Sequence, residues 1–190
     1  MTATVISICN SALTLIGADR IASLSEESEE ATICQERFDH VRDSVLQIFP
    51  WNCCIVRKKL TQNKIKPAFE YQYSHNLPIS PQCLSVLSVQ ETDEWVIEGD
   101  FLVSNTSPVN IVYVGKITEP HKYPPYLCEL IAARLSIEIA YKLTGNVNVH
   151  NSCMQLYTYK LKEAVELEGR QGNMPRTIDD LYRDPWFFRS

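Results

Sequence analysis

The stretch Trp95-Val-Ile-Glu-Gly-Asp-Phe-Leu-Val103 decides the fold class, because it places a β-hairpin in the middle of a chain whose two ends favour helix. Apolar residues lead up to the pair Gly99-Asp100 and resume directly after it. A two-residue Gly-Asp connection suits the primed turns of a tight hairpin, since glycine reaches positive φ without a steric penalty. A cluster of turn residues follows, and Val109-Asn-Ile-Val-Tyr-Val114 predicts a third strand.

Further strands are predicted on the N-terminal side of this hairpin. Residues 53–60 favour a strand, and residues 69–73 alternate aromatic and polar side chains with period two. Residues 83–89 form an apolar run of the kind that a sheet buries. No helical pattern separates these segments, so residues 51–118 are expected to form an antiparallel, β-rich domain of meander or sandwich type.

Helical periodicity covers both flanks of this β-rich segment. Helices are predicted near residues 3–16, 28–48, 126–143 and 149–168. Gly17 is a natural C-terminal stop for the first helix, and the Phe49-Pro50 step ends the second. The stretch Ser23-Leu-Ser-Glu26 offers a capping box ahead of the second helix.

The two C-terminal helices carry distinctive side-chain patterns. Residues 126–143 are apolar over most of the helix circumference, which is typical of the central helix of a bundle. In the last helix the side chains predicted to face inward are Met154, Tyr157, Leu161, Ala164 and Val165.

Together these segments predict an α+β fold. Neither pair of helices closes a good core alone, so residues 1–50 and 119–170 are expected to pack as one four-helix bundle. Residues 51–118 then form a β-rich domain inserted between the two pairs, and residues 171–190 form an extended C-terminal tail.

The composition is that of an ordinary folded chain of 190 residues, with 45% hydrophobic and 22% charged residues. No apolar run approaches the roughly 20 residues that cross a bilayer. No basic region precedes the apolar N-terminal residues, so a signal peptide is not expected. The 7 cysteines include no Cys-x-x-Cys pair, and several lie in apolar helical stripes. This pattern predicts reduced thiols in a cytosolic setting, with Cys9, Cys34 and Cys128 protected.

Charge is spread unevenly along the chain, whose formal net charge is −5. A negative net charge argues against an electrostatic nucleic-acid binder, which normally shows a basic face. Residues 23–48 are strongly acidic and residues 55–70 are strongly basic. The two regions are either ordinary solvated faces or complementary patches of a self-associating protein. In the second interpretation the candidate subunit contacts are Glu26, Glu27, Glu29 and Glu30 on one side, and Arg57, Lys58 and Lys59 on the other.

No stretch of the sequence carries a catalytic or metal-binding motif. The 4 histidines are scattered, and none lies at a zinc-ligand spacing from a cysteine pair. Neither His-Glu-x-x-His, nor Gly-x-Ser-x-Gly, nor a phosphate-cradling glycine loop occurs. We therefore expect no catalytic residue, no cofactor-binding residue and no metal ligand, and we do not expect an enzyme.

The composition of the C-terminal end is not that of a segment that is fully exposed to solvent. A turn-rich linker precedes a segment that concentrates aromatic residues and arginines, the residue types that anchor interfaces. The candidate partner-contact residues are Leu181, Tyr182, Arg183, Trp186, Phe187, Phe188 and Arg189. This segment either folds back on its own helices or docks on another subunit or partner.

Several ordered features resemble one known family. They are Ala12-Leu-Thr-Leu-Ile-Gly17, an acidic helix that ends in Phe49-Pro-Trp51, Tyr73-Ser-His-Asn-Leu-Pro78, the Trp95–Val103 hairpin, the strand at 109–114, Tyr123-Pro-Pro-Tyr-Leu, and the helix around Leu130-Ile-Ala-Ala-Arg-Leu-Ser-Ile-Glu-Ile-Ala140. Their order and spacing resemble the tail tubular protein A family, the head-to-tail adaptors of short-tailed bacteriophages. The resemblance covers nearly the full chain, and no single motif in it is diagnostic.

The resemblance implies a structural virion protein without catalytic residues or cofactors. Members of the family form a dodecameric ring under the portal protein and connect it to the tail nozzle protein. DNA passes through the channel of the ring without sequence-specific binding. The implied location is the tail or neck of the virion, after assembly in the host cytoplasm.

Two other classes of function remain open at this point. One is a soluble module that binds a small ligand or a peptide in its β-rich region. The other is a tail-associated cell-wall hydrolase, which needs a Glu/Asp pair in a cleft.

Overall fold

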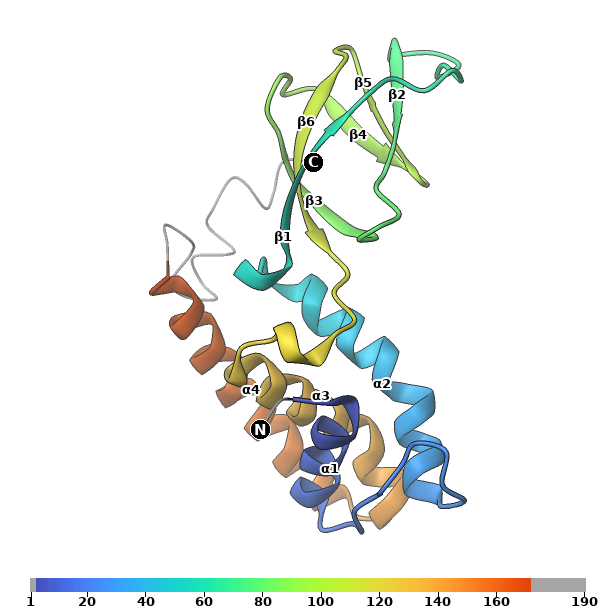
Figure 1. Ribbon diagram of the computed structural model, residues 1–190. Coiled ribbons are helices and arrows are strands. Elements are labelled where there is room, and N and C mark those ends of the chain that lie inside the picture. The colour runs from blue at the N-terminus through green and yellow to red at the C-terminus, as the bar shows by residue number, and fades with distance from the viewer. Residues whose placement is uncertain (1–2, 172–190) are drawn as a thin grey trace. The chain divides into compact units, whose positions relative to one another are not determined.

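The computed structural model of the chain describes residues 3–171. Within this range the protein has four α-helices and two three-stranded antiparallel sheets, which confirms the α+β class (Figure 1). The described residues divide into two compact units. The helical unit comprises residues 3–49 and 118–171, and the β unit comprises residues 50–117.

The first two helices begin at polar caps. The Thr4 hydroxyl accepts a hydrogen bond from the first turn of α1 (Val5–Ile16), and Ser28 does the same for α2 (Glu29–Ile48). Each cap satisfies a backbone N–H group that has no partner inside the helix. Gly17 ends α1 in the left-handed conformation, with φ 75°, as its position predicts.

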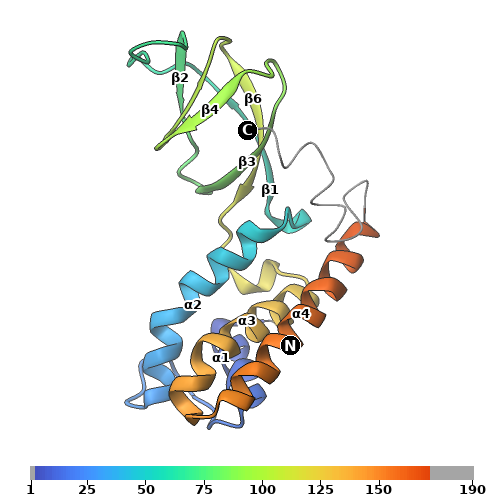
Figure 2. The ribbon, with the colours of Figure 1, turned by 180° about the vertical axis from the view of Figure 1, so that it is seen from behind.

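The third helix, α3 (Pro125–Thr144), contacts all three others, α1, α2 and α4 (Val147–Gly169). In the two opposite views of Figures 1 and 2, α3 lies among them. The side chains of Leu130, Leu135 and Ile139 are fully buried there, as the apolar circumference of this segment predicts. None of the helices in the described part of the chain is long and apolar enough to cross a membrane.

The buried face of α4 differs in part from the predicted stripe. Ala164 and Val165 are buried as expected, but Met154 is 48% exposed and Cys153 is buried instead. Neighbouring helical residues point about 100° apart, so a shift of one residue moves a side chain off the core face. The buried residues of α4 also include Glu168, whose carboxylate accepts a hydrogen bond from the Tyr126 hydroxyl. The spacing of apolar residues alone does not predict that a glutamate belongs to the buried face of a helix.

Gly145 ends α3 with φ 62°, and its amide donates to the carbonyl of Tyr141 at 2.9 Å. A Cβ added at this glycine would meet no atom within 4 Å. Gly145→Ala should therefore cost only the left-handed backbone penalty, about 1–2 kcal/mol of unfolding free energy. Gly145→Asn is the matched control and should cost less, because asparagine tolerates this conformation. Thermal unfolding followed by circular dichroism measures both, and equal losses for the two variants would contradict the backbone explanation.

The β unit contains two antiparallel sheets with strand orders β1-β6-β3 and β2-β5-β4. Its strands are β1 (Ile55–Leu60), β2 (Tyr73–Asn76), β3 (Cys83–Val89), β4 (Trp95–Glu98), β5 (Phe101–Ser104) and β6 (Val109–Gly115). A short 3-10 helix (Asn52–Cys54) precedes β1, and a second one (Pro120–Lys122) precedes α3. The first of these displaces the start of the strand predicted at residues 53–60 to Ile55.

The hairpin predicted at residues 95–103 is confirmed. Strands β4 and β5 pair antiparallel with Glu98 opposite Phe101, and Gly99 takes the positive φ of 59° that the two-residue turn requires. However, β6 does not continue the hairpin as the third strand of a meander. It pairs with β1 and β3 in the other sheet. The predicted meander is wrong here, because the pairing of distant strands leaves no local pattern in the sequence.

The strand predicted at residues 69–73 is also misplaced, since β2 begins only at Tyr73. Glu70 has φ 66°, a value outside the strand region, and the amide of Tyr71 donates to the carbonyl of Phe69 at 2.8 Å. These residues form a tight turn. The aromatic–polar alternation was misleading because Phe69 lies on the surface, with 79% of its area exposed.

The two sheets of the β unit share one apolar core. Its buried members come from strands β1, β3, β5 and β6, and they are Leu60, Val89, Leu102, Val109, Ile111 and Tyr113. Trp95 and Val86 pack against this cluster as partly buried residues. The β unit therefore has a hydrophobic core of its own, distinct from the one around α3.

Candidate subunit-contact surfaces

Glu26, the first residue of the predicted acidic patch, is engaged within its own loop. Its carboxylate accepts hydrogen bonds from the backbone N–H of Ala22 at 2.8 Å and from the Ser28 hydroxyl at 2.9 Å. These bonds hold the pKa of Glu26 below its usual value. Glu26 therefore closes the loop before α2, whereas the residue that caps α2 is Ser28. The capping box predicted at residues 23–26 therefore does not start a helix; these residues form the loop before α2.

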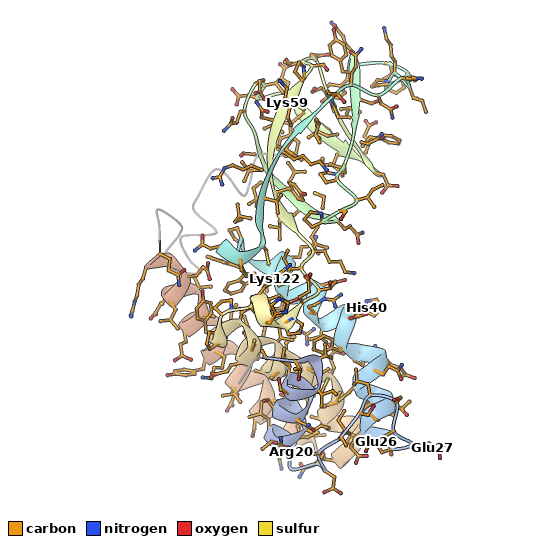
Figure 3. The ribbon with its side chains drawn as sticks, in the orientation of Figure 1. Arg20, Glu26, Glu27, His40, Lys59 and Lys122 are labelled. Atoms are coloured by element: carbon orange, nitrogen blue, oxygen red, sulfur yellow. The ribbon has the colours of Figure 1, made fainter. Side chains whose placement is uncertain are left out.

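The other acidic residues of this patch gather at the N-terminal end of α2. Glu27 precedes the Ser28 cap, and Glu29 and Glu30 form the first turn. Glu27 and Glu29 are exposed and Glu30 is half-buried. Carboxylates at this end of a helix are stabilised by the helix dipole, which accounts for the cluster without any partner. Figure 3 shows Glu26 and Glu27 together in the loop that leads into α2.

The predicted basic patch lies on β1, an edge strand that pairs only with β6 among the described strands. Arg57, Lys58 and Lys59 are all exposed, and no ion pair to any of them occurs within residues 3–171 (Figure 3 labels Lys59). They line a shallow hollow of about 280 Å³ together with Gln90, Asn110, Ile111 and Val112. Asn110 is itself bonded to the Glu91 carboxylate. The two predicted patches thus belong to different units of the chain.

A second acidic surface, which the sequence analysis missed, lies on the hairpin of β4. Glu94, Glu98 and Asp100 are exposed, and none of them forms a side-chain ion pair with another described residue. Beside them Val96 is 43% exposed and Ile97 is 38% exposed. The signal available in the sequence is the row of acids around the hairpin, Glu94, Glu98 and Asp100.

An apolar groove between α1 and α4 was also missed. It has a volume of about 290 Å³ and is lined by Leu15, Ile16, Asn148, Val149, Ser152, Cys153 and Leu156. None of these side chains is charged. Helices α1 and α4 touch each other over only a few residues. The sequence does not predict this groove, because apolar residues that line a groove have the same helical spacing as apolar residues that fill a core.

The one buried histidine among the described residues, His75 on β2, lies beside a serine. Its Nε2 is 3.2 Å from the carbonyl oxygen of Thr106 and 3.4 Å from the Ser104 hydroxyl, and its Nδ1 has no partner in the described structure. Ser104 donates its own hydrogen bond to the Thr106 carbonyl at 2.8 Å. Both side chains are fully buried, so the pair has no access to a substrate. Within residues 3–171 no cluster of His, Cys, Asp or Glu could hold a metal ion.

All seven cysteines are thiols, and no disulfide joins any of them. Cys9 on α1 and Cys34 on α2 are fully buried, whereas Cys128, the third one predicted to be protected, is half-buried. Contact with the Cys34 thiol and burial raise the pKa of Cys9. Burial also raises the pKa of Cys83, to about 11.

Cys83 should react slowly with alkylating reagents in the folded protein. A pKa of about 11 instead of 9.0 lowers the fraction of reactive thiolate about 100-fold at neutral pH. Iodoacetamide labelling followed by mass spectrometry measures the rate for each cysteine, and the urea-unfolded chain is the control. Cys9 and Cys34 should be protected by burial as well. Rapid labelling of any of these three in the folded state would contradict the expectation.

The predicted partner-contact residues of the C-terminal segment lie outside the described residues. They are Leu181, Tyr182, Arg183, Trp186, Phe187, Phe188 and Arg189. Their role stays a prediction.

The fold and surfaces define an α+β protein with a two-segment helical unit, a β unit and several exposed charged surfaces. No protein-family model matches the chain, and no curated protein matches it either.

Proposed function

We propose that this protein is a structural adaptor of a short-tailed bacteriophage that forms a ring between the portal and the tail nozzle. The observation that carries the proposal is the order of the elements. Two helices, a contiguous β unit and two further helices follow one another in the chain. That order is the one expected from the resemblance of the sequence to the head-to-tail adaptors.

In this proposal the four helices pack as one bundle, and the residues after α4 form an extended tail. The contacts of α3 with α1, α2 and α4 support the first part. The aromatic and arginine-rich composition of residues 181–189 supports the second. The tail is then an assembly element that docks on the portal or on a neighbouring subunit.

A ring requires two different, mutually complementary surfaces on each subunit. The exposed basic strand β1 supplies one such surface, with Arg57, Lys58 and Lys59 unpaired in the described structure. The acidic start of α2, with Glu26, Glu27, Glu29 and Glu30, is the counterpart that the sequence predicts, although Glu26 is engaged within its loop. The net charge of −5 suits a channel for DNA, because like charge keeps phosphate contacts from accumulating.

Electron microscopy of the purified protein mixed with its portal tests the proposal. We expect a dodecameric ring of additional density on one end of the portal, and the portal alone is the control. Free protein and unchanged portal particles at saturating concentration would contradict the adaptor function.

The groove between α1 and α4 favours a second candidate function, a module that binds an apolar peptide or ligand. A protein that binds no portal but binds an apolar peptide would support it. The hydrolase alternative gains no such support. The hollow beside β1 and the groove between α1 and α4 are not lined by Asp or Glu.

A further inference from the structure

Two edge strands of the β unit carry opposite charge. Strand β1 is an edge of the sheet β1-β6-β3, and strand β4 is an edge of the sheet β2-β5-β4. Within the described residues each of them pairs with a single neighbour, β6 and β5 respectively. Each strand therefore leaves one row of backbone N–H and C=O groups without a strand partner in the structure.

The side chains on the two edges are complementary. Strand β1 presents the consecutive cations Arg57, Lys58 and Lys59, all exposed. Strand β4 and its turn present Glu98 and Asp100 together with the partly exposed Val96 and Ile97, and Glu94 lies just before the strand. No described residue neutralises these charges. Opposite charges on directly paired strands stabilise pairing, whereas like charges destabilise it.

We propose that β4 of one copy pairs with β1 of the next copy and extends its sheet across the subunit boundary. The inference rests on the proposed function in that it supplies a contact between neighbours in the ring. It assigns the basic strand to an acidic strand edge rather than to the acidic start of α2. Strand addition to an exposed sheet edge is an established mode of recognition, in which backbone bonds give affinity and side chains give specificity.

The charges also exclude the wrong pairings. Two β1 edges would bring three cations against three cations, and two β4 edges would bring together two surfaces that both carry Glu94, Glu98 and Asp100. Charged edge strands prevent self-pairing of sheets in this way. Only the mixed pairing is attractive, and it joins two different surfaces, so it is heterologous and propagates from copy to copy as a ring requires.

The proposed contact between β4 and β1 is small and exposed to solvent, so its affinity should be low. Strand β4 has 4 residues, and the charged side chains are screened by salt beyond about 10 Å at 0.1 M ionic strength. We therefore expect weak association in dilute solution, stronger association at low salt, and full pairing when copies are gathered on a common template.

Zero-length cross-linking with a carbodiimide tests the pairing, because the reagent joins a carboxylate to an amine only where they are in contact. Unlabelled and heavy-isotope-labelled full-length chains are mixed and treated at high concentration, alone and bound to portal. We expect linked peptides of mixed isotope composition that join Lys58 or Lys59 to Glu94 or Glu98. Their yield should fall as the salt concentration rises.

Charge reversal supplies the matched variants. Lys59→Glu should lower the association of copies, measured by sedimentation, about fivefold or more. Adding Glu98→Lys should restore it, whereas adding Glu27→Lys should not. All these positions are exposed, so the melting temperatures should stay unchanged and separate an interface effect from misfolding.

The outcomes separate the pairing from the adaptor function. Rescue by Glu27→Lys, or mixed-isotope links from Lys58 or Lys59 to residues 26–30, would overturn the strand pairing and leave the ring intact. The absence of mixed-isotope links in both arms would overturn the pairing whether or not portal binds. Mixed-isotope links in a protein that does not bind portal would keep the pairing and defeat the adaptor function.

Discussion

Leu135→Ala is expected to lower the unfolding free energy of the helical unit by about 2–5 kcal/mol. Leu135 is fully buried in α3, the helix that contacts α1, α2 and α4. Truncation removes buried methyl groups and leaves a cavity among residues from several helices, which cannot all relax into it. Urea unfolding followed by far-ultraviolet circular dichroism measures the loss.

The control for this substitution lies on the same helix. Tyr141 is 59% exposed, so Tyr141→Ala changes helix composition without opening a cavity and should alter stability by about 0.5 kcal/mol or less. Similar effects of the two substitutions would mean that α3 is not the centre of the core.

Deleting residues 176–190 is expected to abolish incorporation of the protein into portal-containing particles and to leave its melting temperature unchanged. The segment follows a linker that contains glycine and proline, and it concentrates Tyr182, Trp186, Phe187 and Phe188 beside arginines. At an interface each large side chain contributes about 1.5–3 kcal/mol from burial, less the cost of ordering the segment.

Trp186 is the expected main anchor of this segment, since tryptophan dominates many interfaces. Trp186→Ala should therefore lose most of the incorporation that the deletion loses, and Ser190→Ala is the matched control. A large fall in melting temperature on deletion would show that the aromatic residues complete the subunit's own core. The assembly role would then fail.

The helices were predictable from sequence because their signals are local. The apolar period, the stop at Gly17 and the proline after Phe49 place the C-terminal ends of α1 and α2 at the observed residues. The turn at Gly99 was predictable for the same reason. The partner of β6 was not, because β6 pairs with strands that lie far away in the chain.

The candidate surfaces were less predictable than the fold. The charges of Arg57, Lys58 and Lys59 are visible in the sequence, but their position on a sheet edge depends on the pairing of β1 with β6. Glu26 looks like one more surface acid, and only the structure gives it hydrogen bonds to its own loop. The charged edge of β4 needs the same knowledge of strand order.

The division of the helical unit into two chain segments has a consequence for biosynthesis. Helices α1 and α2 leave the ribosome before the β unit, whose residues 50–117 are contiguous, and α3 emerges only afterwards. At about 5–20 residues per second, this interval of about 70 residues lasts several seconds. During that time the nascent helices lack the α3 surface against which they are buried, and at its end the β unit is complete before any residue of α3 has been made. We expect the β unit to fold first and the newly made α1 and α2 to be the segment on which chaperones act.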